Sequence, residues 1–276
     1  MQVTRQTARW SPAPAIQATG ALHLCGAAAL ALAASEWRWV AATLLANHCV
    51  LFAACLVPRS RLLGPNVVRL PETAARRREV ALTFDDGPDP EVTPRVLDLL
   101  DRHGAVGTFF CIGERAAAHP RTVREIVERG HAVENHGYRH TLGFAWQGPW
   151  RLHRDIAEAQ QAIGDAAGVA PRFFRAPCGV RSPMLDGVLE RFGLTYVTWR
   201  RRGFDTVDAD APRVLRRLSK RLAPGDVLLL HDGTILRYGP SEPPVLRVLP
   251  ALLARLEERG LRSVSLRRAF GLGRPS

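Results

Sequence analysis

From residue 79 onwards, short apolar runs alternate with stretches of helical periodicity. The apolar runs include VALTF at 80–84, TFFC at 108–111 and VLLL at 227–230, and the helical stretches include PEVTPRVLDLLDRHG at 90–104. Several helical stretches end at a glycine, the residue that most readily adopts the left-handed conformation that ends a helix. This alternation is typical of repeated βα units around a parallel sheet. The sequence therefore predicts an α/β domain over residues 79–270.

Residues 1–58 differ from this pattern, because they contain two long segments without a charged residue, at 15–34 and 39–57. Each segment approaches the length of about 20 residues with which a helix crosses a bilayer. Glu36 and Arg38 lie between them, so we expect a helical hairpin in a membrane. Two alternatives stay open: a cleaved signal peptide ending at Ala31-Leu32-Ala33, and a soluble helical hairpin. The Pro-, Gly-, Asn- and Arg-rich residues 59–78 predict a linker.

The overall charge favours an anionic partner. The formal net charge is +12 at pH 7 and comes from arginine, since Lys220 is the only lysine. Lipid headgroups or an acidic glycan would suit such a charge. No nucleic-acid-binding motif is present, so nucleic acid is not an expected partner. The five cysteines lack the spacing of a disulfide framework.

Charged and imidazole side chains follow the expected strands, where parallel α/β folds form their sites. These residues are Asp85, Asp86, His136, Arg175, Asp205 and His231. Two carboxylates at the end of one strand can point to opposite faces and take different roles. The alternative is that Asp85 and Asp86 only cap the turn that Gly87-Pro88 predicts.

The histidines of HGYRH, His136 and His140, have the spacing that lets two imidazoles reach one metal ion. Asp86 would complete a site with two histidines and one carboxylate, which leaves Asp85 free to act as a base. Taken alone, a pair of histidines at this spacing is also frequent on exposed turns.

Four motifs in order make the chain similar to the polysaccharide deacetylases with a NodB-homology domain, carbohydrate esterase family 4. They are TFDDGP at 83–88, HGYRH at 136–140, RAPCG at 175–179 and LLLHD at 228–232. The resemblance extends from about residue 79 to about residue 268. It implies a distorted (β/α)7-type barrel and a divalent metal ion, most often zinc, with cobalt or another divalent ion as alternatives.

The resemblance also implies a role for each matching residue. Asp86, His136 and His140 would hold the metal ion, and Asp85 would be the general base that deprotonates water. His231 would be the general acid. Arg175 would pair with Asp85 and keep it ionised, and Asp205 would orient His231.

Two positions depart from the family pattern. RAPCG has Cys178 where an aromatic residue is usual, so the backbone amide of Cys178 remains as a donor to the oxyanion while the pocket widens. Thr206 stands where a tryptophan usually follows the acid of the fourth motif.

Leu229 fits the apolar wall of the substrate pocket, or is a core leucine. Trp146 and Trp150 suit stacking on sugar rings, packing on the domain, or a membrane interface.

The predicted function is removal of an N-acyl group, such as acetyl, from an amino sugar of a polysaccharide or glycolipid. One alternative is deformylation or deacetylation of a lipid-linked sugar at the cytoplasmic face of the membrane. A catalytically inactive glycan-binding module is another. Retention of a base and an acid beside the metal ligands disfavours the inactive module.

The distribution of arginines predicts which side of a bacterial inner membrane holds the catalytic domain. Arg5 and Arg9 precede the first apolar segment, and Arg59, Arg61 and Arg69 follow the second. Only Arg38 lies in the turn. Because Lys and Arg collect on the cytoplasmic side, we expect a two-pass protein with a cytoplasmic catalytic domain. The periplasmic side stays open, because family members that act on wall polymers work outside the cytoplasm.

Overall fold

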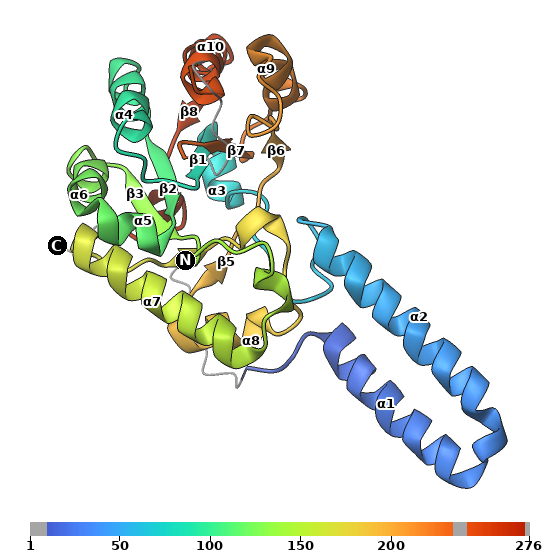
Figure 1. Cartoon of the computed structure of the whole chain (residues 1–276). Coiled ribbons are helices and arrows are strands. Elements are labelled where there is room, and N and C mark those ends of the chain that lie inside the picture. Colours follow the sequence, from blue (N-terminus) through green and yellow to red (C-terminus); the bar gives the residue numbers. More distant parts are fainter. Residues whose placement is uncertain (1–9, 234–241, 274–276) are drawn as a thin grey trace.

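The computed structural model describes residues 10–233 and 242–273. It consists of an α/β barrel with a helical hairpin that projects from one side (Figure 1). The strands are β1 Glu79–Asp85, β2 Gly107–Cys111, β3 Ala132–Asn135, β4 Phe173–Phe174, β5 Thr195–Tyr196, β6 Arg201–Arg202, β7 Val227–His231 and β8 Arg262–Ser263. Their order is β5-β4-β3-β2-β1-β7-β6, with β8 paired to β1, and all these pairs are parallel. This parallel half-barrel confirms the predicted fold.

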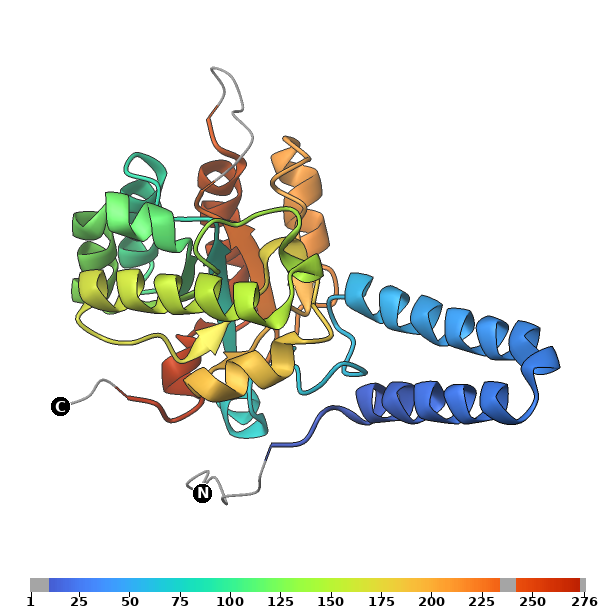
Figure 2. The ribbon, with the colours of Figure 1, turned by 60° about the horizontal axis from the view of Figure 1, so that its bottom comes forward.

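Helices surround the strands on the outside (Figures 1 and 2). They are α3 Glu72–Arg76, α4 Val92–Arg102, α5 Gly113–Ala118, α6 Pro120–Glu128, α7 Pro149–Ala167, α8 Leu185–Phe192, α9 Ala211–Ser219, α10 Pro244–Glu258 and α11 Leu266–Ala269. Short 3-10 turns occur at η2 Phe144–Trp146 and η3 Pro177–Gly179, which lie in the loops after β3 and β4.

Alternation along β1 divides the core in two. Leu82 and Phe84 belong to the cluster that joins the sheet to the helices, and Phe84 stacks on Phe109 at 4.8 Å between ring centroids. Ala81 belongs to the other cluster, inside the barrel, together with Leu229. Because side chains alternate between the two faces of a strand, Asp85 continues the inner row. Asp85 is thereby positioned inside the barrel mouth, beside Phe110 and His231 of the neighbouring strands.

The hairpin consists of α1 Pro14–Leu32 and α2 Trp37–Leu56, joined by η1 Ala34–Glu36. Both arms are long and apolar enough to cross a membrane, and few of their residues are buried. The arms contact each other through Thr19 and Asn47, where the Asn47 Nδ2 donates to Thr19 Oγ1 at 3.0 Å. The hairpin extends away from the barrel in both views (Figure 2). These features agree with the predicted hairpin, and its membrane insertion stays a prediction.

The residues predicted as a linker contact the barrel. Val67 forms an isolated parallel bridge with Val197, and the Leu70 N–H donates to Gly225 O at 2.8 Å. This segment therefore packs against the residues that directly follow β5 and directly precede β7. The division at residues 58 and 78 stays a prediction.

Candidate active site

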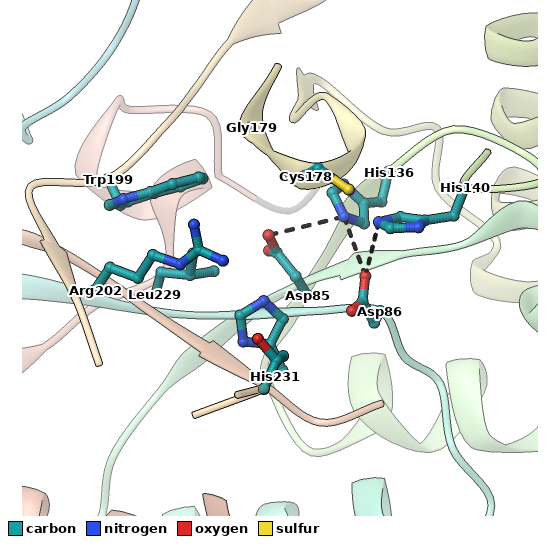
Figure 3. Close-up of a pocket in the computed structure, with 11 residues that line it drawn as sticks. Asp85, Asp86, His136, His140, Cys178, Gly179, Trp199, Arg202, Leu229 and His231 are labelled. Carbon is teal, nitrogen blue, oxygen red and sulfur yellow. Dashed lines mark ion pairs between the residues drawn. The ribbon is translucent and has the colours of Figure 1, made fainter. Parts of the chain in front are cut away.

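The predicted site residues come together in one cavity at the C-terminal ends of the strands (Figure 3). The cavity is lined by Asp85, Asp86, His136, His140, Cys178, Gly179, Trp199, Arg202, Thr206, Leu229 and His231. Arg175 and Asp205 lie behind this lining, where they contact Asp85 and His231. All nine residues expected from the sequence thus lie in or directly behind the cavity.

Asp86, His136 and His140 form a compact group of potential metal ligands. Asp86 Oδ1 lies 3.3 Å from His136 Nε2 and 3.1 Å from His140 Nε2. The His136 Nδ1 lies 2.8 Å from the Arg175 carbonyl oxygen. Since a carbonyl can only accept, Nδ1 must carry a proton, and Nε2 is the nitrogen that faces Asp86 and would bind a metal ion.

The environment of Asp86 fits a cation. Its Oδ1 is buried and receives no hydrogen bond in the described part of the chain. Burial raises the pKa of Asp86, but His136 and His140 outweigh this effect and hold the pKa well below its usual range. An ionised carboxylate and two imidazoles are a donor set that zinc and similar divalent ions use, with positions left for water and substrate. The residues therefore fit the divalent metal ion that the sequence predicts, without fixing which ion it is.

The backbone supports this group with unusual conformations. Asp86 has φ 70° and His140 has φ 49°, values that residues with side chains seldom adopt. Such conformations cost free energy and cluster at functional sites. Their presence at two of the three ligand positions supports a function for this geometry.

Asp85 is held by a fully buried arginine. Arg175 Nη1 donates to Asp85 Oδ1 at 2.6 Å and to Thr83 Oγ1 at 2.9 Å, and its guanidinium lies 4.0 Å from the centre of the Phe110 ring. Burial lowers the pKa of Arg175, and the Asp85 carboxylate opposes that effect. The second oxygen, Asp85 Oδ2, lies 3.8 Å from His136 Nε2. One carboxylate oxygen is therefore anchored while the other faces the potential metal ligands.

His231 has its own carboxylate partner. Asp205 Oδ1 lies 3.0 Å from His231 Nδ1, and Asp205 Oδ2 accepts a 2.8 Å hydrogen bond from the His231 backbone N–H. Burial lowers the pKa of His231, but Asp205, followed by Asp86 and Asp85, raises it to about 9. The imidazole is thus protonated at neutral pH, as a general acid requires.

The loop after β4 closes one side of the cavity. Cys178 is exposed and has φ 57°, and Gly179 has φ 73°. A Cβ on Gly179 would lie 2.4 Å from Trp199 Cη2, so only glycine permits this contact. Leu229 lines the cavity and also belongs to the inner core, and its contact with a substrate stays a prediction.

Gly179, Trp199 and Arg202 also line the cavity and are not among the residues predicted from the sequence. Trp199 ends the apolar run LTYVTW and Arg202 follows it by three residues. Because sites of parallel α/β folds lie at the ends of strands, this position could have indicated both residues. The run itself predicts a six-residue strand, whereas β5 covers only Thr195–Tyr196.

Comparisons with known proteins agree with this geometry. The family model described as polysaccharide deacetylase matches residues 72–197. A chitooligosaccharide deacetylase of Bradyrhizobium sp. is 34% identical over 194 residues, which cover 66% of this chain and 86% of that protein. A peptidoglycan-N-acetylglucosamine deacetylase of Bacillus cereus is 33% identical, over 70% of this chain and 69% of that protein.

A solved structure also has this fold. The Bc1960 peptidoglycan N-acetylglucosamine deacetylase superimposes with a TM-score of 0.68 at 29% identity, covering 76% of this chain and 95% of its own. The motifs, the parallel half-barrel and the extent of these matches lead to one assignment. The chain belongs to the polysaccharide deacetylase family.

Proposed function

We propose that the chain is a metal-dependent deacetylase that hydrolyses the N-acetyl group of an amino sugar in a polysaccharide or glycolipid. The observation that carries this proposal is one cavity in which three potential metal ligands lie together with an anchored carboxylate, Asp85, and a carboxylate-paired imidazole, His231. The named relatives act on chitooligosaccharide and peptidoglycan N-acetylglucosamine, and an acetylated amino sugar is the substrate class that they share.

Each residue has a defined task in this proposal. Asp86, His136 and His140 hold the divalent ion, with zinc as the first choice. When bound, such an ion makes water a stronger acid and polarises the acyl carbonyl. Asp85 accepts the proton from the attacking water through Oδ2, while Arg175 keeps Oδ1 fixed.

The second half of the reaction needs an acid and a donor to the oxyanion. His231 donates the proton from Nε2 to the departing amine, because Nδ1 is held by Asp205. The backbone N–H of Cys178 is the proposed donor to the acyl oxygen. A cysteine at this position occupies less space than an aromatic ring, which favours a wider acyl pocket.

Catalytic inactivity and deformylation both have less support than deacetylation. An inactive glycan-binding module has no need for two buried ion pairs aimed at one cavity. Deformylation remains chemically feasible in this site, but the named relatives are deacetylases.

We further propose that the hairpin anchors the enzyme in a bacterial inner membrane. Phe52 of α2 stacks on Trp146 of η2 at 5.4 Å, and the Arg181 N–H donates to Cys55 O at 3.1 Å. The C-terminal end of α2 therefore contacts the loops that follow His140 and Cys178. Exposed Trp150 and Leu142 near these loops suit a membrane interface. A membrane-inserted hairpin would hold the cavity close to the bilayer surface.

The arginine distribution favours the cytoplasmic side. Arg59, Arg61 and Arg69 follow α2, and only Arg38 lies at the hairpin turn. Arg5 and Arg9, which contribute to the same count, lie outside the described residues. A cytoplasmic domain would act on lipid-linked or other intracellular acetylated amino sugars, and a periplasmic one on wall polymer.

The test is acetate release by the purified, zinc-loaded full chain from N-acetylated chitooligosaccharides and peptidoglycan fragments. We expect turnover that a chelator abolishes and zinc restores, and no turnover by His140→Ala. Release of acetate that is insensitive to both the chelator and His140→Ala would contradict the proposal.

A further inference from the structure

Arg202 is a cation of the cavity for which the described residues provide no anionic partner. Two other cations of the site have carboxylate partners, since Arg175 pairs with Asp85 and His231 pairs with Asp205. No carboxylate of the described chain forms an ion pair with Arg202, although its side chain lines the same cavity. Arg202 is therefore a cation of this site that no carboxylate of the described residues holds in an ion pair.

The fold directs this side chain inwards. Arg201 and Arg202 form β6, and neighbouring side chains of a strand point to opposite faces. Arg201 uses the outer face, where its Nε donates to Asp226 Oδ2 at 2.8 Å. Arg202 is opposite Leu229 of β7 in the register and points into the cavity (Figure 3). Arg201 and Arg202 therefore point to opposite faces of β6, and Arg202 occupies the position that faces the cavity.

Aromatic rings hold Arg202 in place. Its guanidinium carbon lies 5.3 Å from the centre of the Trp199 ring and 4.8 Å from that of Phe204. Contacts of this kind stabilise an arginine by cation–π attraction and limit its freedom. The Nε atom of Arg202 is buried and makes no hydrogen bond to the described residues. A polar donor that is buried without a partner costs free energy unless a ligand satisfies it.

We infer that Arg202 binds an anionic group of the substrate, a phosphate or a carboxylate attached close to the acylated sugar. A planar guanidinium with several donors matches the paired oxygens of both groups. Arg202 would then act as a specificity residue that makes the enzyme prefer anionic amino sugars to neutral oligosaccharides. This inference rests on the proposed function and narrows its substrate class.

The experiment measures selectivity. The full chain, zinc-loaded, is assayed on three substrates: neutral tetra-N-acetylchitotetraose, an alkyl phosphodiester of N-acetylglucosamine 1-phosphate, and a disaccharide that carries the lactyl carboxylate of N-acetylmuramic acid. We expect higher kcat/KM on an anionic substrate, mainly through lower KM. The phosphate and carboxylate arms identify which anion is bound.

Arg202→Gln should reduce the ratio of kcat/KM for the anionic over the neutral substrate by about 10–100-fold, the range expected for hydrogen bonds between charged groups. Arg202→Lys should retain part of that preference. The matched control is Arg200→Gln, because Arg200 is exposed and does not line this cavity. It should leave the ratio unchanged.

A binding measurement separates this inference from the proposed function. Calorimetry with zinc-loaded Asp85→Asn measures the affinity for the same three compounds without turnover. The double variant Asp85→Asn/Arg202→Gln is compared with Asp85→Asn. If the second substitution weakens binding of the anionic compounds but not of the neutral one, the inference is supported even if no substrate is deacetylated. If the proteins with Arg202 and with Gln at this position bind each of the three compounds equally well, the inference is overturned. Equal kinetic losses on all substrates would also overturn it, because Arg202 would then serve the reaction in general.

Discussion

Asp205→Asn should change the way in which the stability of the protein depends on pH. The pKa of His231 is about 9 in the folded protein, against 6.5 for an ordinary histidine. A pKa difference of one between the folded and unfolded protein corresponds to about 1.36 kcal/mol, so protonation of His231 contributes about 3 kcal/mol to the free energy of unfolding. Because the folded pKa is the higher one, this contribution is complete below pH 6.5 and is lost as the pH rises through about 9.

Asn keeps the size of the side chain and an oxygen that accepts the His231 backbone N–H, but it removes the negative charge. Burial, which lowers the pKa of His231, is then opposed only by Asp86 and Asp85. We therefore expect Asp205→Asn to destabilise the metal-free protein by about 1–3 kcal/mol more at pH 6 than at pH 10.

Urea unfolding of the metal-free chain at pH 6, 8 and 10 measures this difference. Asp98→Asn is the control, since Asp98 is an exposed carboxylate that pairs with Arg129 far from the site. In the zinc-loaded enzyme, the alkaline limb of kcat/KM should move to lower pH in Asp205→Asn and stay in place in the control. The role given to Asp205 is refuted if Asp205→Asn has the same alkaline limb of kcat/KM and the same pH dependence of stability as the wild type.

Three further predictions concern the metal, the pocket and the hairpin. His136→Ala and His140→Ala should each lose stoichiometric zinc, measured by mass spectrometry of metals, and retention of one equivalent would exclude these residues as ligands. Cys178→Tyr should leave zinc affinity unchanged and narrow the range of accepted acyl groups; unchanged selectivity would place Cys178 outside the acyl pocket. A C-terminal fluorescent protein should fluoresce and a C-terminal alkaline phosphatase should be inactive, because the domain is predicted to be cytoplasmic. The reverse pattern would place the domain in the periplasm.

The sequence predicted the fold because its strands and helices carry clear periodicities. The β1 run VALTF and the β7 run VLLL are apolar enough to mark central strands, and Asp85 and His231 follow them directly. Parallel strands bring their C-terminal ends together, so residues far apart in the chain were expected at one rim. The pairing of Asp85 with Arg175 came from the family resemblance, and the geometry agrees with it.

Other features depend on tertiary contacts that leave no pattern in the sequence. The strands β5 and β6 have two residues each, too few for a period of two to be recognised. The inward direction of Arg202 was therefore not predictable. The contacts of residues 66–70 with the barrel were not predictable either. The composition of this segment indicates a linker, and its backbone N–H groups donate to the carbonyl oxygens of Tyr196 and Gly225. These contacts exist only once the barrel has formed.

Zinc content and acetate release, measured together on Asp85→Asn, test the central claim most directly. Asp85 is not among the three proposed ligands, and an amide cannot take up the proton from water. The variant should therefore bind one equivalent of zinc, as the wild type does, and release acetate about 10²–10⁴-fold more slowly. Near-normal acetate release by zinc-loaded Asp85→Asn would contradict the account.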